Sequence, residues 1–304
     1  MKRILLGMGL ISLLGLTPAA RAQSLVREVR GAVARQDFDA ARNALEKARG
    51  QGPVSPQWLE AYSWLARGYL NAKRYDGAER EAVQTRTMAL ELLKTRKLDD
   101  DRALPIALGA SIEVQAQVLN ARGQKSEAVA FLEEELRRWQ GTSIVTRLRK
   151  NLNLISLAGR PAPALIVREA LGGPVPELSA LKGKRVLLFF WAHWCEDCKS
   201  MAPALERLMR EQPQIELIAP TQPYGYVARG EDAPRGDEIR YIDEVRRKFY
   251  GQVPRMRVPV SEENFVVWGA STTPTIAVLD EQGVVRLYHP GKMSYEELAA
   301  ALRQ

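Results

Sequence analysis

Two cysteines, Cys195 and Cys198, are the residues whose type and spacing could do chemistry in this chain. They lie in the stretch FFWAHWCEDCKSMAP, residues 189–203, where a buried apolar run gives way to helical spacing. A sulfur at the start of a helix faces unpaired amide N–H groups and the positive end of the helix dipole. These groups stabilise a thiolate, so the pattern predicts a lowered pKa for Cys195. Cys198 lies one helical turn further on, where it can close a disulfide with Cys195 and resolve a mixed disulfide.

Two other interpretations of the cysteine pair are weaker. A structural disulfide across two intervening residues closes a very small loop and removes little entropy from the unfolded chain. A zinc site normally needs four ligands, and besides its cysteines the chain has only two histidines, His193 and His289. His193 would have to turn back onto the metal at the end of a strand. Redox chemistry is therefore favoured, and no metal or other cofactor is expected.

The length and charge of the chain limit the classes of protein that it can belong to. With 304 residues it is long enough for two domains, each with its own core. The formal net charge is +8, but the basic residues are interspersed with acidic ones along helical stretches. That pattern is typical of solvated helix faces and argues against a nucleic-acid partner.

The N-terminus has the pattern of an export signal. A positively charged start, MKR, precedes an apolar run of 13 residues, Pro18 ends the run, and Ala20 and Ala22 stand at the positions that a signal peptidase recognises. A membrane span needs about 20 apolar residues, so an uncleaved anchor is the less favoured alternative. We predict a signal peptide at residues 1–22 and a mature chain in a periplasm, where paired thiols are oxidised unless a partner keeps them reduced.

Residues 23–158 are predicted to form a helical domain, because apolar residues recur at intervals of three and four without strand-like alternation. Weak internal sequence repeats resemble tetratricopeptide repeats, in which a small residue lets two antiparallel helices approach each other. Three such small residues, Ala41, Ala78 and Ala128, are separated by 37 and 50 residues. A strict repeat has about 34 residues, so a plain helical bundle is the alternative. Stacked helix pairs would offer a surface to a protein or peptide partner.

The composition changes near LAGRPAPAL, residues 157–165, where glycine and proline mark the predicted domain boundary. Strands and helices alternate over the following segment, residues 159–304. Strands are expected at 164–170, 185–191, 214–222 and 257–261, and a hairpin at 273–291. Helices are expected at 195–212, 237–250, 262–269 and 294–303. Ser294 and Glu297 fit a capping box at the start of the last helix.

Two segments carry a resemblance to a known family. VLLFFWAHWCEDCKSMAP, residues 186–203, resembles the active-site segment of thioredoxin-fold proteins, where a buried strand runs into Trp-Cys-x-x-Cys. STTPTIAVLDEQGVV, residues 271–285, is similar to their cis-proline segment. The approach from Pro163 and the extra segment between Thr221 and Tyr250 are most similar to the TlpA/ResA-like extracytoplasmic thiol–disulfide oxidoreductases. The resemblance covers residues 160–304 and implies an α/β thioredoxin-like domain preceded by the all-α, tetratricopeptide-like domain.

The resemblance also implies roles for the matching residues. Cys195 would be the attacking thiol and Cys198 the resolving one, with Trp194 packed over the disulfide. Pro274 would follow a cis peptide bond, and the backbone of Thr273 would pair with an extended substrate. Protein thiols or disulfides would be the substrates, and a membrane electron donor would recharge the pair. The helical domain could hold a separate protein partner.

The chain departs from thioredoxin around the cysteines. Phe189 stands where thioredoxin has a buried Asp that moves the proton of the resolving thiol, which leaves the proton acceptor unassigned. His193 is a candidate for that role, although a histidine at a strand end is more often a partly exposed structural residue. Glu196 and Asp197 stand between the cysteines, where carboxylates oppose a thiolate. We therefore expect a reducing centre and a reductase of protein disulfides, with a disulfide oxidase or isomerase, or a scaffold protein whose helical domain recruits a partner, as alternatives.

Overall fold

A computed structural model describes residues 18–50 and 52–303 of the chain. The first 17 residues of the predicted signal peptide lie outside this range. Contacts divide the chain into two compact units, residues 1–111 and 112–304, which are described separately. In the part of the chain that the structure describes, no helix has both the length and the apolar character needed to cross a membrane.

The first unit is helical throughout. Its helices pack in neighbouring pairs, α1 with α2 and α3, and α3 with α4. The elements are α1 (Pro18–Ala34), α2 (Phe38–Arg49), α3 (Pro56–Asn71), α4 (Tyr75–Leu92), the short 3-10 turn η1 (Leu98–Asp100) and the first part of α5 (Ala103–Ala121). Gly68 lets α1 and α3 approach, because a Cβ there would overlap the side chain of Val33. The helical prediction for this region is confirmed, and Ala41 and Ala78 are fully buried where the helices meet.

The second unit begins with helices and continues as an α/β domain. The remainder of α5 is followed by α6 (Lys125–Arg138) and α7 (Val145–Ser156). The strands are β1 (Glu169–Leu171), β2 (Val186–Phe190), β3 (Glu216–Ile218), β4 (Val258–Val260), β5 (Thr275–Leu279) and β6 (Val285–Pro290). The later helices are α8 (Glu196–Ser200), α9 (Ala202–Glu211), α10 (Arg235–Tyr250), α11 (Glu262–Trp268) and α12 (Tyr295–Ala301), with 3-10 turns η2 (Leu178–Leu181) and η3 (Ala228–Gly230).

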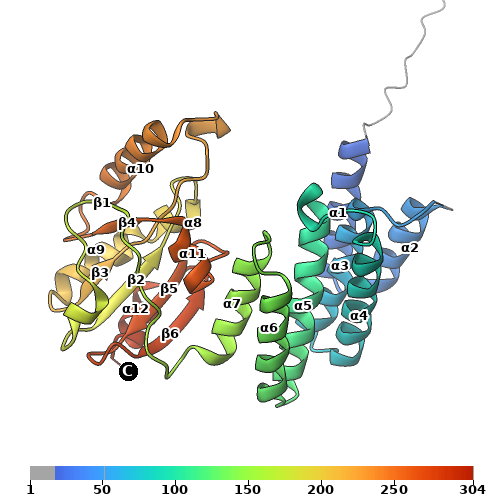
Figure 1. Ribbon diagram of the computed structural model, residues 1–304, viewed down its shortest axis with the longest axis horizontal. Coiled ribbons are helices and arrows are strands. Elements are labelled where there is room, and N and C mark those ends of the chain that lie inside the picture. The colour runs from blue at the N-terminus through green and yellow to red at the C-terminus, as the bar shows by residue number, and fades with distance from the viewer. Residues whose placement is uncertain (1–17, 51, 304) are drawn as a thin grey trace, which may run out of the picture. The chain divides into compact units, whose positions relative to one another are not determined.

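The main sheet has four strands in the order β3-β2-β5-β6. Strand β2 runs parallel to β3 and antiparallel to β5, and β5 and β6 form the predicted hairpin. Every residue of β2 is buried, because helices cover both faces of the sheet (Figure 1). Alternate side chains of β2 enter different cores: Leu187 and Phe189 pack with residues of α8, α9, α10 and α12, whereas Leu188 and Phe190 pack with residues of α11.

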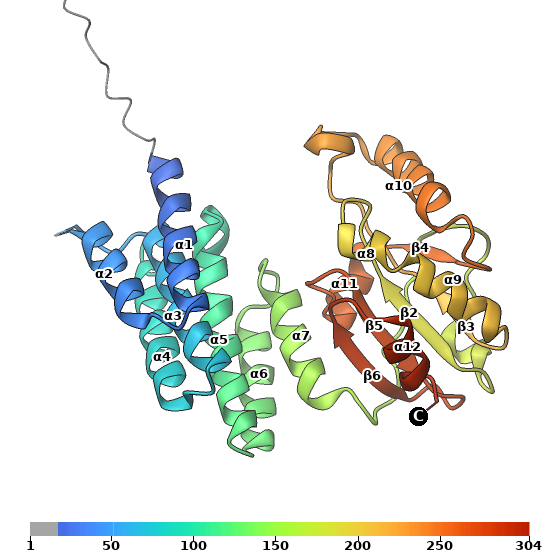
Figure 2. The same ribbon diagram turned by 180° about the vertical axis from the view of Figure 1, so that it is seen from behind.

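Helix α7 belongs to the second unit and packs against α11. Figures 1 and 2 show the two helices next to each other. The Asn153 side chain donates a hydrogen bond of 2.8 Å to the carbonyl oxygen of Trp268, the last residue of α11. Gly269 follows with φ 63°, and a Cβ at this position would overlap the backbone of Lys150 in α7. A helix from the predicted helical region is therefore fixed to the α/β domain by backbone contact.

The predicted strand over residues 164–170 is wrong in extent, because only its end forms β1, which pairs with β4. The reason lies in Asn264 of α11, which hydrogen-bonds to both the N–H and the carbonyl oxygen of Ile166 at 2.7 Å. A side chain thus satisfies the backbone groups that a neighbouring strand would otherwise pair. The other predicted strands and helices of residues 185–303 form, but the strand at 214–222 is limited to β3 and the helix at 195–212 is divided into α8 and α9. The capping box of Ser294 and Glu297 is confirmed.

Candidate active site

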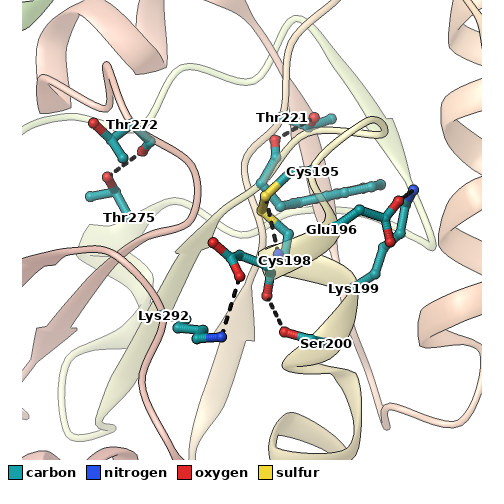
Figure 3. Close-up of a disulfide and its surroundings, with 11 residues drawn as sticks. Cys195, Glu196, Cys198, Lys199, Ser200, Thr221, Thr272, Thr275 and Lys292 are labelled. Carbon is teal, nitrogen blue, oxygen red and sulfur yellow. Dashed lines mark hydrogen bonds and ion pairs between the residues drawn. A yellow bond between two sulfur atoms is a disulfide. The ribbon is translucent and has the colours of Figure 1, made fainter. Parts of the chain in front are cut away.

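Cys195 and Cys198 lie where β2 has ended and α8 begins, and they form a disulfide (Figure 3). Cys195 is the N-cap of α8, and its sulfur accepts a hydrogen bond of 3.1 Å from the backbone N–H of Cys198. The predicted placement of Cys195 at a helix start is confirmed, and one amide N–H of the first turn, that of Cys198, donates to its sulfur. An N–H group directed at sulfur favours its charged form over the neutral thiol.

The two sulfurs differ in their access to solvent. Cys195 keeps 4% of its surface exposed, whereas Cys198 is fully buried in the larger core. Trp194, immediately before the pair, is 46% exposed. The disulfide can therefore be approached only from the side of Cys195, and Cys198 can exchange only with its neighbour.

The carboxylates between the cysteines are both exposed and both paired with lysine. Glu196 forms an ion pair of 2.7 Å with Lys199, and Asp197 one of 3.3 Å with Lys292. The ion pairs and the surrounding water weaken the repulsion that these carboxylates exert on a thiolate. Their effect on Cys195 is consequently smaller than the sequence alone suggests.

The proline segment lies at the same end of the sheet as the cysteines. Phe190, the last residue of β2, pairs with Thr275, the first residue of β5. The continuation of β2 toward Cys195 and the residues before β5 therefore emerge from neighbouring strand ends, and Figure 3 draws this segment in the surroundings of the disulfide. The Thr273–Pro274 peptide bond is cis, as the resemblance implies. Among the described residues, no backbone–backbone hydrogen bond involves Thr273, so its amide and carbonyl can pair with another chain.

The buried position of Phe189 holds no titratable group. Its ring packs edge-to-face against Tyr250, with 6.0 Å between ring centroids. Trp191 is fully buried and donates a hydrogen bond of 3.0 Å to the carbonyl oxygen of Ala219, so it belongs to the core.

His193 differs from the sequence-based expectation, because it is 2% exposed rather than partly exposed. Its Nε2 lies 3.1 Å from Oε1 of Glu238, a fully buried residue of α10. Burial lowers the pKa of the imidazole, although the hydrogen bond and charge of Glu238 act in the opposite direction. In the described part of the chain, no three or more His, Cys, Asp or Glu side chains are grouped so as to hold a metal.

Glu238 and three tyrosines contact His193, and nothing in the sequence singles them out. The rings of Tyr224, Tyr226 and Tyr241 surround His193 edge-to-face, with centroids 5.4 to 5.7 Å away. Glu238 follows His193 by 45 residues and lies in a helix whose charged residues are otherwise exposed or half-buried. No local pattern in the sequence links these residues.

Comparisons with known proteins agree with this geometry. Residues 177–304 match the family described as the thioredoxin-like domain. The chain is 28% identical to the thioredoxin-like protein YneN of Bacillus subtilis (strain 168) over 144 residues, which is 47% of this chain and 78% of that protein. It is 25% identical to the thiol–disulfide oxidoreductase ResA of Bacillus thuringiensis (strain Al Hakam) over 48% of this chain and 77% of that protein. It is also 25% identical to the thiol:disulfide interchange protein DsbE of Xylella fastidiosa (strain Temecula1) over 46% of this chain and 65% of that protein.

Proposed function

We propose that the thioredoxin-like thiol–disulfide oxidoreductase domain of this chain works as a reductase of protein disulfides. The observation that supports this most directly is the asymmetry of the Cys195–Cys198 pair. Cys195 caps a helix and keeps 4% of its surface exposed, whereas Cys198 is fully buried. Such a pair can attack a foreign disulfide with the first sulfur and release the product with the second.

The reaction consists of two thiol–disulfide exchanges. The Cys195 thiolate attacks one sulfur of the substrate disulfide, forms a mixed disulfide and releases the other substrate sulfur as a thiolate, which takes up a proton. Cys198, as a thiolate, then attacks the Cys195 sulfur, and the substrate leaves with its second thiolate. Two electrons have passed to the substrate, and the enzyme carries the Cys195–Cys198 disulfide that the structure contains. A membrane electron donor is proposed to reduce this disulfide again.

The substrate is proposed to bind beside the pair through Trp194, Thr273 and Pro274. Trp194 presents an exposed indole next to Cys195. The unpaired backbone of Thr273, held by the cis bond to Pro274, can accept an extended substrate segment as an added strand.

The reducing direction is supported by the charges close to Cys195. His193 has a lowered pKa and faces Glu238, so at neutral pH it adds no positive charge near the sulfur. Both lysines near the pair are engaged with Glu196 and Asp197. A thiolate without a dedicated cation is less stabilised, and a less stable reduced form makes the centre a stronger reductant.

Location and domain roles are further parts of the proposal. The N-terminal pattern supports export through a signal peptide at residues 1–22 to the periplasm. The helical region, residues 23–158, is proposed to recruit a protein partner to the oxidoreductase domain at residues 159–304. Its tetratricopeptide-like character is supported by the close helix approach at Gly68.

The experiment is insulin reduction by the full-length protein, with dithiothreitol supplied to regenerate the Cys195–Cys198 dithiol, together with measurement of the redox potential of the pair. We expect activity, its loss in Cys195→Ser, and accumulation of a mixed disulfide on Cys195 in Cys198→Ser. A potential near the roughly −270 mV of thioredoxin supports a reductase, whereas one near the roughly −120 mV of DsbA favours an oxidase. Activity that persists in Cys195→Ser would favour the scaffold alternative.

A further inference from the structure

A buried side-chain pair fixes the turn that carries Cys195. The backbone N–H of Cys195 donates to the carbonyl oxygen of Ala192 at 3.1 Å, which places His193 and Trp194 in the middle of a tight turn. His193 points inward to Glu238 of α10, and Trp194 points outward to solvent. The inner half of the turn is thus fixed to a helix that begins 40 residues later in the chain.

Glu238 binds a third segment as well. Its Oε1 also accepts the backbone N–H of Tyr224 at 2.5 Å, and its Oε2 accepts the N–H of Gly225 at 2.8 Å. A buried carboxylate is stable only when such donors replace its lost hydration. Because the pKa of His193 is lowered, the imidazole is neutral at neutral pH and its Nε2 carries the hydrogen that faces the carboxylate. One carboxylate therefore joins the Cys195 turn, the loop at residues 224–225 and α10.

The loop held by Glu238 also supports Trp194. The rings of Trp194 and Tyr224 meet edge-to-face with 5.5 Å between centroids. Tyr224 also lies edge-to-face against His193, with 5.7 Å between ring centroids. The exposed indole beside Cys195 is consequently held by the same loop whose amides are bound to Glu238.

We propose that Glu238 and His193 are positioning residues for protein substrates. They hold the side chains of Trp194 and Tyr224 in fixed positions beside Cys195. A substrate polypeptide binds against these two side chains while its disulfide reaches the Cys195 sulfur. The inference rests on the proposed reductase function and adds residues that never touch the substrate. The Cys195 sulfur itself is bound by the Cys198 N–H, which this pair does not supply. Loss of the pair should therefore weaken substrate binding and leave the chemical step intact.

The test compares Glu238→Gln with Glu244→Gln in the full-length protein. Glu244 is an exposed residue of the same helix, so its variant removes the same charge without touching the turn. Gln has a single acceptor oxygen and cannot satisfy all three N–H donors. We expect KM for insulin to rise roughly tenfold in Glu238→Gln, as for a lost hydrogen bond to a charged group. We expect kcat and the rate with a small disulfide, dithiobis-nitrobenzoate, to stay within about twofold, and the measured pKa of Cys195 to stay unchanged.

Variants of His193 distinguish a role in positioning the substrate-binding side chains from an effect on the stability of the fold alone. His193→Phe keeps a ring among the tyrosines but lacks the donor, whereas His193→Gln places an amide N–H near the Nε2 position. We expect the Phe variant to raise KM and the Gln variant to recover most of the loss. These two variants decide the matter if Glu238→Gln does not fold.

Any one of three results would overturn the proposal. The first is an unchanged KM in folded Glu238→Gln, and the second is an unchanged KM in His193→Phe. The third is a variant in which only kcat falls, KM stays constant and the urea midpoint is lowered, because a loss of stability would then explain the effect. Failure of the reductase function itself is distinguishable, because the unsubstituted protein would then not reduce insulin.

Discussion

Gly269→Ala tests whether α7 is part of the oxidoreductase domain. Gly269 ends α11 in the left-handed conformation, with φ 63° and ψ 31°. A Cβ there would overlap the backbone nitrogen of Lys150 and lie 2.7 Å from the carbonyl carbon of Arg149. Both are backbone atoms of α7, so no side-chain rotation relieves the overlap and the helix must move away from α11.

The size of the effect follows from two contributions. A side chain in the left-handed region costs about 1–2 kcal/mol. Movement of α7 also weakens the buried Asn153–Trp268 hydrogen bond, worth about 1 kcal/mol, and the packing of Leu157 with Trp268 in the smaller core, worth about 1 kcal/mol more. Gly269→Ala should therefore lower the free energy of unfolding of the second unit by about 3–4 kcal/mol.

Gly283→Ala is the matched control. Gly283 has φ 78° in the β5–β6 turn, and a Cβ there meets no atom within 4 Å. Gly283→Ala should therefore have only the cost of placing a side chain in the left-handed region, about 1–2 kcal/mol. Urea unfolding of the full-length variants, with hydrogen exchange followed on residues 145–156, separates the two contributions. Equal destabilisation by both substitutions, or unchanged protection of α7 in Gly269→Ala, would show that the close contact with Lys150 does not hold α7 against α11.

Three further predictions concern other contacts. Because burial lowers the pKa of His193 below its ordinary 6.5, the unfolded chain binds this proton more readily than the folded protein does. The free energy of unfolding should therefore fall as the pH drops below about 6.5, and urea unfolding of His193→Gln should lack this part of the fall. Asn153→Ala should cost about 1–2 kcal/mol in the second unit, whereas Leu154→Ala, at an exposed position of the same helix, should cost little, as measured by urea midpoints. Tyr62→Phe removes the 2.6 Å hydrogen bond to buried Glu81 and should destabilise the first unit by about 1–3 kcal/mol in the same assay; an unchanged midpoint would show that the bond contributes nothing.

The sequence was sufficient where the determinants of structure are local. The change from a continuous apolar run to helical spacing placed Cys195 at a helix start, and Ser294 with Glu297 marked the start of the last helix. In each case the residues that decide the structure lie within about one or two turns of one another.

The sequence was insufficient where distant residues satisfy a backbone or a buried charge. The run at residues 164–170 has strand-like composition, yet Asn264 hydrogen-bonds to Ile166 and ends the strand pairing. The spacing of 45 residues between His193 and Glu238 corresponds to no period of a helix or strand. Helix α7 has the composition of the helical region and packs against α6, but it also packs against α11 of the α/β domain.

Two of these long-range contacts, both in the second unit, fix the chain segments that lead to the active-site residues. The turn before Cys195 is held from within by Glu238, and the segment that leads to Thr273 is held at Trp268 by Asn153. Each contact satisfies a polar group at or just beyond the end of a secondary-structure element, where the chain has no regular partner of its own. Disulfide exchange needs only the local geometry of Cys195 and Cys198. Selection of a substrate also needs the turn before Cys195 and the segment before Thr273 to stay in fixed positions. Substitutions at Glu238 or Asn153 should therefore alter which polypeptides are reduced before they alter whether a disulfide can be reduced at all.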